Sequence, residues 1–555
     1  GTSPDDISVY EGRLAYEGLV RWGPMGRKVL PNLAVRWEIT DGGRTYTFWL
    51  RKGVRWSDGK PFTADDIMFW YEDVVKNSEL TPMIGRTWVR GGELFQLEKL
   101  DDYTVRYKFK EPHGLFLKRL AEGSYWAIFP AHYLKQFHPK YVPKERLEQM
   151  AREKSFDLWY QLFWEKRSYL NPEIPRLWPW VMTQPPPARP VVFERNPYYW
   201  KVDPEGNQLP YIDRVTYGIY SPETINLKAI NGEIGMQARH MDFRNYPLFM
   251  SNRGKGGYRV LHWISGGGGT LQLGLNLNHK DPVLKEIFHD RRFRIALSHA
   301  INRDEINEAK FFGIGTPRQL CPPRASPYYC PEYERAYIEY DPQLANRLLD
   351  EMGLDKKNAD GIRLRPDGKP LTLHVETTSI LGIMGDAELI ADYWTAVGVK
   401  TQIKEEARQL LCLRKDALVY DVGVWQAADE LMPLMDPRYF FPYNPGSIQG
   451  IDYARWWRSK GKAGEKPTPE MLRCIELYEE IQRTPEANEA KQIRLFKKII
   501  DLNLQNLWVI GTIGEVPTIV LVSNTFRNVP EVAVYGWLFR SPGNTAPECY
   551  SIEEN

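Results

Sequence analysis

Few residue patterns in this 555-residue chain could carry out catalysis. There is no Gly-x-Ser-x-Gly nucleophile elbow, no His-Glu-x-x-His zinc motif and no phosphate-binding loop. The tetraglycine at 266–269 lacks a following Gly-Lys-Ser/Thr and leads into a predicted strand rather than a helix. The chain has only nine histidines, and none of them is grouped like metal ligands. The sequence therefore predicts no metal, no organic cofactor and no enzymatic activity.

Glycoside hydrolysis is the one chemistry that these absences do not exclude. Two carboxylates that meet only after folding leave no local spacing to recognise. A hydrolase would turn over an aryl glycoside, whereas a binding protein would only be stabilised by its ligand. A glycosidase is therefore kept as the alternative from another functional class.

Aromatic side chains offer a binding chemistry instead. They make up 13% of the chain, with 19 Trp and 31 Tyr. Planar rings suit both the faces of sugars and the side chains of peptides. The alternative is a large aromatic core together with packing between lobes.

Cys321 and Cys330 are the pair of thiols whose spacing suggests chemistry. They flank the Pro-rich turn PPRASPYY, a short loop that a disulfide could close. A bridge would fit an oxidising compartment. Two unpaired thiols in a surface loop are the other interpretation.

Length and charge limit the kinds of protein that the chain can be. Single hydrophobic cores stop growing at about 250 to 300 residues, so at least two lobes are expected. With 73 basic and 71 acidic residues, the net charge of +2 gives no field that would attract nucleic acid or anionic lipid. No apolar run reaches the roughly 18 residues that a bilayer span needs.

The elements that must position these residues are short strands interleaved with amphipathic helices, which indicates an α/β fold. Alternation predicts strands at 45–50 and 103–109, and Thr63 with Asp66 predicts the capped start of a helix. Periodicity predicts further helical regions at 290–308, 342–352 and 471–504.

Three stretches suggest how the lobes are joined. The Pro-rich stretch 183–190 must be extended, which is typical of a connection between lobes. The tetraglycine offers little backbone resistance to a change of direction and is predicted to be a hinge. The strand-like tail beyond Gly514 is expected to return to the first lobe.

Residues 33–75 contain a series of motifs in a fixed order: Leu33-Ala34, an aromatic strand, LRKGV at 50–54, WSDG at 56–59 and TADD at 63–66. This series resembles the signature of bacterial extracellular solute-binding proteins of family 5, the dipeptide, oligopeptide, nickel and cellobiose binding group. Further matches follow in the family's order at NPYYW 196–200, DRRFR 290–294, AINRDEI 300–306 and YDP 340–342. The resemblance covers nearly the whole chain.

The resemblance implies a two-lobed periplasmic-binding-protein fold of class II, cluster C type, with an extra α/β subdomain on the first lobe and hinge closure around a ligand between the lobes. The expected boundaries are 1–27, 190–265 and 512–555 for the first lobe, 28–189 for its inserted subdomain, and 266–511 for the second lobe. Family members usually open with a strand that is missing here, so either the true mature start is absent or the first lobe is built differently.

Trp425 and Asp429 are the ligand contacts that the resemblance implies, because 424–429 is similar to the family's Trp-x-Ala-Asp segment. In peptide-binding members this carboxylate pairs with the α-ammonium of the ligand, a charge-assisted bond. Here three residues separate the Trp from the Asp instead of two. Asp429 could instead be a helix cap or a solvated acid.

Four aromatic residues near the expected lobe junctions are further candidates: Trp263, Trp508, Tyr535 and Trp537. A ligand contact needs an exposed ring face, whereas a role in the core or between lobes needs no exposure.

The expected function is that of an extracytoplasmic substrate-binding component, periplasmic or lipid-anchored, which delivers an oligopeptide or an oligosaccharide to an ABC permease in the membrane. We expect a monomer with no nucleic acid partner. A peptide sensor or chaperone without a permease would have the same fold.

Overall fold

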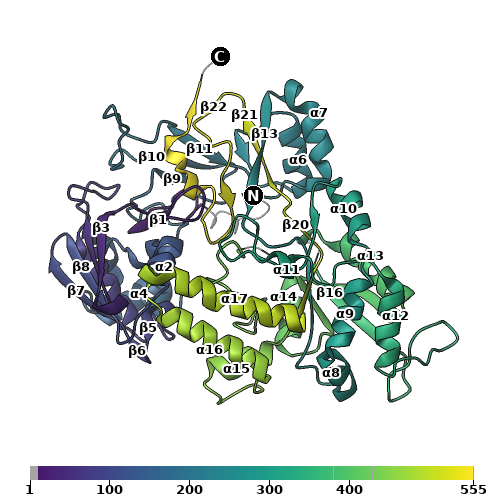
Figure 1. Cartoon of the computed structure of the whole chain (residues 1–555). Coiled ribbons are helices and arrows are strands. Elements are labelled where there is room, and N and C mark those ends of the chain that lie inside the picture. Colours follow the sequence, from purple (N-terminus) through teal and green to yellow (C-terminus); the bar gives the residue numbers. More distant parts are fainter. Residues whose placement is uncertain (1–9, 379–380, 428, 554–555) are drawn as a thin grey trace. The chain divides into compact units, whose positions relative to one another are not determined.

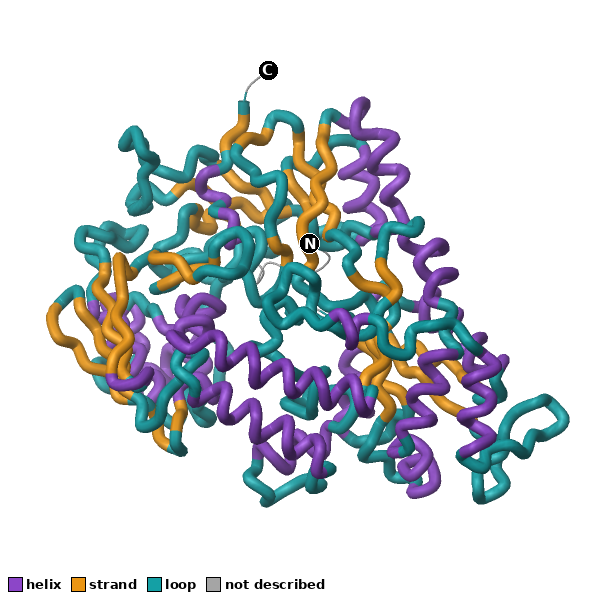
Figure 2. The backbone as a smooth tube through the Cα atoms, in the orientation of Figure 1, coloured by secondary structure: helices purple, strands orange, loops and turns teal. Residues whose placement is uncertain are grey.

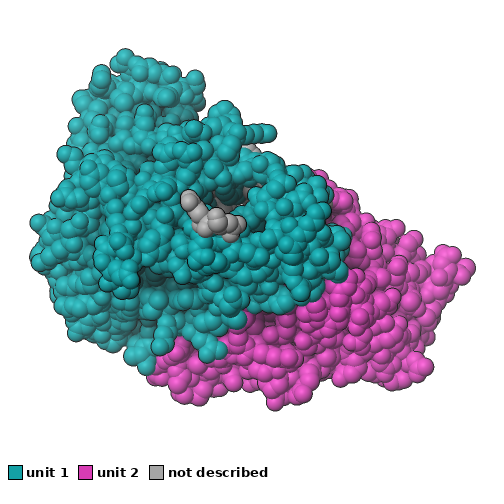
Figure 3. All heavy atoms as spheres, turned by 90° about the horizontal axis from the view of Figure 1, so that it is seen from above, with its two compact units in different colours: residues 1–263, 482–487, 518–555 teal, residues 264–481, 488–517 magenta. Residues whose placement is uncertain are grey.

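The computed structural model describes residues 10–378, 381–427 and 429–553. The chain forms two compact units, which Figure 3 colours separately: unit 1 comprises residues 1–263, 482–487 and 518–555, and unit 2 comprises residues 264–481 and 488–517. The sequence predicts the second lobe at 266–511. The outer ends of unit 2, residues 264 and 517, lie within a few residues of the ends of that range. The separation of 28–189 as a subdomain of the first lobe stays a prediction.

A four-stranded antiparallel sheet opens unit 1 (purple and blue in Figure 1). Its order is β3 (Ala34–Thr40), β4 (Thr45–Leu50), β8 (Thr104–Lys108) and β7 (Gln96–Asp101). Helix α1 (Ala64–Phe69) begins at Thr63, whose side chain and that of Asp66 form a capping box. The two strands and the helix start that the sequence predicts here are confirmed.

The Pro-rich stretch does not connect the two units, contrary to the prediction. It joins β9 (Trp180–Gln184) to β10 (Val191–Arg195), and these strands pair antiparallel within unit 1, with β11 (Arg214–Tyr217) on the other side of β10. Proline fixes φ and so predicts an extended loop, but the same loop geometry serves a hairpin as well as a link between domains.

Four helices of unit 1 precede this hairpin: α2 (Phe116–Gly123), α3 (Ala131–Leu134), α4 (Lys144–Glu153) and α5 (Trp159–Arg167).

A second four-stranded sheet of unit 1 takes two strands from the middle of the chain and two from its C-terminal end (Figure 1). Its order is β12 (Met236–Gln237), β21 (Thr518–Ser523), β13 (Tyr258–Ser265) and β23 (Val534–Tyr535). Strand β21 pairs antiparallel with β13, with Thr518 opposite Trp263. Helices α6 (Pro222–Ile230) and α7 (Tyr246–Gly256) precede β13. The tail thus returns to the unit that contains the N-terminal half.

Unit 2 is built on a mixed five-stranded sheet. Its order is β17 (Lys400–Glu405), β16 (Thr372–Thr377), β18 (Val422–Trp425), β14 (Gln272–Leu275) and β19 (Val509–Gly511). Strand β16 is parallel to both of its neighbours, whereas β14 is antiparallel to β18 and β19. The accompanying helices include α8 (Pro282–His289), α13 (Met384–Ala396), α14 (Arg408–Asp416) and α15 (Ile451–Arg458).

The predicted helical regions of unit 2 are present, but two of them are interrupted. Region 290–308 forms α9 (Arg291–His299) and α10 (Arg303–Phe311), because the Asn302 side chain caps a new start. Region 471–504 forms α16 (Pro469–Arg483) and α17 (Glu489–Asn506), which the loop containing Pro485 separates (Figure 2). Helix α12 (Pro342–Glu351) ends before Gly353, as predicted.

Candidate functional site

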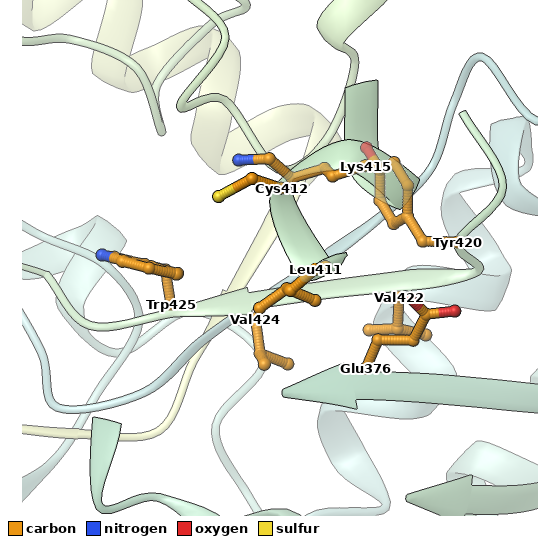
Figure 4. A pocket seen from close by; sticks show the side chains of 9 residues that line it. Glu376, Leu411, Cys412, Lys415, Tyr420, Val422, Val424 and Trp425 are labelled. Carbon is orange, nitrogen blue, oxygen red and sulfur yellow. The ribbon is translucent and has the colours of Figure 1, made fainter. Parts of the chain in front are cut away.

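Trp425 ends the central strand of the unit 2 sheet. It lies directly opposite Gln272 of β14, and its ring is half-buried. The guanidinium carbon of Arg408, at the start of α14, lies 5.9 Å from the centre of the ring. Figure 4 shows Trp425 at the end of its strand, near side chains from α14. Loops that leave the carboxyl ends of strands are where ligands usually bind in α/β sheets, and Trp425 occupies such a position.

A small cavity adjoins Trp425 between β18 and α14 (Figure 4). Its lining residues are Glu376, Leu411, Cys412, Lys415, Tyr420, Val422, Gly423, Val424 and Trp425. The cavity volume of about 10 Å³ has room for about one water molecule. It is therefore too small for a peptide or a sugar.

Asp429 is half-buried, and its neighbour Glu430 fixes the segment that carries it. The buried Glu430 carboxylate accepts hydrogen bonds from the backbone N–H of Gly268 at 2.9 Å and from that of Asp429 at 3.2 Å. The backbone N–H of Leu431 donates to the carbonyl of Gly266 at 2.8 Å. Burial raises the pKa of Glu430 to about 7. Glu430 was not predicted as a site residue, because an acidic doublet alone gives no sign that one member is buried.

The tetraglycine is therefore hydrogen-bonded to the segment of Glu430, and the prediction that it is a hinge stays a prediction. A Cβ atom on Gly268 would lie 2.6 Å from the carbonyl oxygen of Cys321, and one on Gly269 would lie 2.2 Å from the Gln272 amide nitrogen. These glycines allow backbone and side chains to approach closely. The chain passes between the units a little earlier, between residues 263 and 264.

Trp263 and Trp508 are core residues of units 1 and 2, respectively. Trp263 has no exposed surface, and its indole N–H donates to the carbonyl of Pro530 at 3.0 Å. Trp508 is also buried, just before β19. Neither ring offers the exposed face that stacking on a ligand requires, so both have the packing role that the sequence left open.

Trp537 is exposed over 48% of its surface, and Tyr535 is half-buried. The guanidinium carbon of the buried Arg13 lies 4.1 Å from the centre of the Trp537 ring and 5.8 Å from that of Tyr535. The guanidinium carbon of Arg239 lies 5.1 Å from the centre of the Trp537 ring. These two arginines could not be predicted from the sequence, because they are far from Trp537 along the chain.

Cys321 and Cys330 are free thiols. Of the two alternatives that the sequence left open, a disulfide or unpaired thiols, the structure has the unpaired thiols. The Cys321 thiol is buried and donates to the carbonyl of Cys330 at 3.2 Å, whereas the Cys330 thiol donates to Glu332 at 3.3 Å. The two sulfur atoms thus point to different partners, and no bridge closes the loop.

Among residues 10–378, 381–427 and 429–553, no group of three or more His, Cys, Asp or Glu side chains could hold a metal ion. No helix in the described part of the chain has both the length and the apolar character needed to cross a membrane.

Sequence relatives of the chain include two binding proteins. It is 30% identical over 373 residues, 64% of this chain and 51% of the relative, to the periplasmic alpha-galactoside-binding protein of Rhizobium meliloti. It is 25% identical over 509 residues to the dipeptide-binding protein of Escherichia coli, which covers 87% of this chain and 83% of the relative. The chain thus spans about half the length of the first relative and most of the second.

Solved structures show the same fold. An oligopeptide-binding protein OppA matches with a TM-score of 0.78 and 41% identity, over 100% of this chain and 90% of that one. The periplasmic binding protein MelB of Agrobacterium fabrum, solved with stachyose, matches with a TM-score of 0.71 at 23% identity, over 97% and 80% of the chains. These neighbours are periplasmic binding proteins, so the fold expected from the sequence is confirmed.

A family profile described as bacterial extracellular solute-binding proteins, family 5 (middle), matches residues 28–446. This match includes the signature at 33–75 and the candidate segment at 424–429, and it covers well over half of the chain. The chain belongs to the family 5 bacterial extracellular solute-binding proteins.

Proposed function

We propose that this protein is the substrate-binding component of an ABC importer, that it works outside the cytoplasm, and that it delivers an oligopeptide or an oligosaccharide to a membrane permease. The observation that carries the proposal is the 41% identity to an oligopeptide-binding protein over the whole chain. The family match supports binding rather than catalysis as the activity. Closure of the two lobes around the ligand, which the resemblance implies, is part of this proposal.

Four residues are proposed as ligand contacts: Trp425 and Asp429 in unit 2, and Tyr535 and Trp537 in unit 1. The half-buried ring of Trp425 would supply apolar or stacking contact. The Asp429 carboxylate would pair with a ligand ammonium, a bond that strengthens when water is excluded. Trp263 and Trp508 would contribute through packing, since both are buried.

The ligand class is the open part of the proposal. The oligopeptide-binding neighbour is 41% identical, whereas the alpha-galactoside-binding relative is 30% identical over a shorter part of the chain. The longer spacing between Trp425 and Asp429 weakens the argument for amine recognition. Both classes therefore enter the experiment.

The test is a thermal-shift screen of purified protein against matched panels of short peptides and oligosaccharides. A ligand present at 100 times its dissociation constant should add about 2.7 kcal/mol of stability. Variants Asp429→Asn and Trp425→Leu are compared with two exposed controls, Asp355→Asn and Trp164→Leu, which should respond as the unmodified protein does.

Each outcome of the screen has a definite meaning. Peptide hits lost in Asp429→Asn would establish amine recognition. Oligosaccharide hits that survive Asp429→Asn but are lost in Trp425→Leu would establish a sugar-binding protein. Turnover of an aryl glycoside would favour the glycosidase alternative, and the absence of any shift across both panels would contradict the proposal.

A further inference from the structure

Basic residues are concentrated at the end of α15 and in the turn that follows it, within unit 2. Residues 455–466 read RWWRSKGKAGEK, with five basic residues and one acidic residue, and we call them the basic segment. The loop between α15 and α16 projects at the lower edge of Figure 1. Four of its cations are exposed: Arg458, Lys460, Lys462 and Lys466. The balanced charge of the whole chain therefore conceals a strongly basic local surface.

These four cations have no fixed partner. Their side chains form no hydrogen bond and no ion pair with any described residue. The acid of the segment, Glu465, instead accepts from Nζ of Lys285 at 2.7 and 2.8 Å. Asp452, in the first turn of α15, pairs with Arg455 at 3.1 Å, and Glu470, at the start of α16, pairs with none of the four among the described residues. The positive charge is therefore available to an external anion.

The backbone that carries these side chains is fixed by local contacts. The Ser459 hydroxyl donates to the carbonyl of Ala463 at 3.0 Å and accepts from the N–H of the same residue at 2.9 Å. The N–H of Gly461 donates to the carbonyl of Trp456 at 2.8 Å. Gly464, with a φ of 84°, packs so closely that a Cβ atom would lie 2.3 Å from the carbonyl oxygen of Asp452. A turn that is already formed loses little backbone freedom when it binds a partner.

Trp456 adds an aromatic ring to the same turn. Its ring is half-buried and lies against Gly461, where a Cβ atom would be 3.6 Å from the indole nitrogen. The indole N–H makes no hydrogen bond with any described residue and is not enclosed. An aromatic ring with an apolar body and a free N–H suits the boundary between water and lipid.

We propose that the basic segment binds the surface of an anionic phospholipid membrane, with Lys460 and Lys462 beside headgroup phosphates and Trp456 at the level of the headgroups. Lysine ammonium groups are flexible point charges, which suit the mobile phosphates of a lipid surface better than the fixed geometry of a protein partner. The contact acts at short range, since physiological salt screens charges beyond about 8 Å.

This inference goes beyond the proposed function. None of the proposed ligand contacts lies in residues 455–466. The membrane contact therefore does not depend on whether the ligand is a peptide or a sugar.

The test is co-flotation of the purified full chain with vesicles of phosphatidylcholine, prepared with and without phosphatidylglycerol. Binding is expected only to the anionic vesicles, and it should disappear in high salt, because salt screens exposed charges. Inorganic phosphate at matched ionic strength should not displace the protein, since one small anion cannot meet several cations. The double variant Lys460→Gln/Lys462→Gln should weaken binding about tenfold or more, because each basic residue near an anionic surface contributes roughly fivefold.

A matched control separates the position of the charge from its amount. The double variant Lys356→Gln/Lys357→Gln removes the same charge from two exposed lysines elsewhere in unit 2, and it should bind vesicles as the unmodified protein does. Trp456→Leu should weaken binding to anionic vesicles but leave its salt dependence unchanged. Melting curves of both lysine variants should match that of the unmodified protein.

Several results would overturn the inference. One is equal binding to neutral and anionic vesicles, and another is full binding by Lys460→Gln/Lys462→Gln. Displacement by inorganic phosphate would assign the segment to a small anion. No binding to lipid vesicles, with charge-dependent binding only when they carry the permease, would assign it to a protein interface. The thermal-shift screen tests the proposed function separately, so each of these failures would leave that function intact.

Discussion

Glu430 carries a buried carboxyl group between the tetraglycine and the segment of Asp429. Its two backbone donors favour the charged form, but burial favours the neutral form, and the nearby Asp429 and Asp436 carboxylates act in the same direction as burial. The result is a pKa of about 7 in the folded protein, against 4.5 for an ordinary glutamate. The charge of this residue thus changes near neutral pH.

Stability should fall as pH rises through this range. Because the folded protein holds the Glu430 proton more tightly than the unfolded chain, the stability contributed by this group is complete below pH 4.5 and is lost as pH rises through about 7. Glu430→Gln remains neutral. It should match the unmodified protein near pH 4.5 and be more stable by about 2 to 3 kcal/mol at pH 8.

Urea unfolding of both proteins between pH 4.5 and 8 measures this difference directly. If the two stability profiles ran parallel across the whole range, Glu430 would not titrate between the folded and unfolded states.

At the scale of elements, two residues of the tetraglycine are closely packed. Flexible glycine permits a hinge, but it also permits close packing. The carbonyl of Cys321 and the side chain of Gln272 fill the space that a Cβ atom would need at Gly268 and Gly269. Gly268 and Gly269 therefore allow close packing inside unit 2.

A substitution at Gly268 tests this role. Gly268→Ala places a Cβ atom 2.6 Å from a backbone oxygen that cannot easily move, and it should destabilise unit 2 by about 1–3 kcal/mol. The matched control is Gly254→Ala on the exposed side of α7, where a Cβ atom meets nothing within 4 Å. That control should gain about 0.5–1 kcal/mol of stability. Unchanged stability of Gly268→Ala would contradict this packing role.

Strands and helix starts were easier to predict from the sequence than the connections between elements. Alternation at 45–50 and the Thr63 capping box depend on neighbours in the sequence, and both are present. The Pro-rich stretch at 183–190 was misread because proline determines the shape of a loop and not which strands it joins. Trp425 was found through a motif, whereas Arg13, Arg239 and Glu430 acquire their positions only through long-range packing.

At the scale of the whole molecule, the connections between the units are few. The chain passes between them next to Trp263, again at both ends of the loop 482–487, and finally just before Thr518. The first and last of these crossings lie at paired residues of β13 and β21. A bend at this pair of strands is therefore the simplest way for the lobes to close.

Ligand binding should consequently make the protein more compact. Small-angle scattering at saturating ligand is expected to give a smaller radius of gyration than the free protein, because the proposed function includes closure of the lobes around the ligand. The same ligand added to Trp425→Leu should leave the radius unchanged. An identical radius with and without ligand, under conditions where binding is shown calorimetrically, would argue against closure.

The chain order of the sheet that contains β13 also affects how the protein is made. Strands β12 and β13 are synthesised early, but their partner β21 lies beyond the whole of unit 2. Until residues 518–523 emerge, β13 has an unpaired edge of the kind that promotes aggregation. Unit 2 has its five strands complete first and is expected to fold ahead of unit 1. A fragment ending at residue 263 should accordingly aggregate. Fast release of the completed chain and protection of β13 by chaperones should both increase the yield of the full chain.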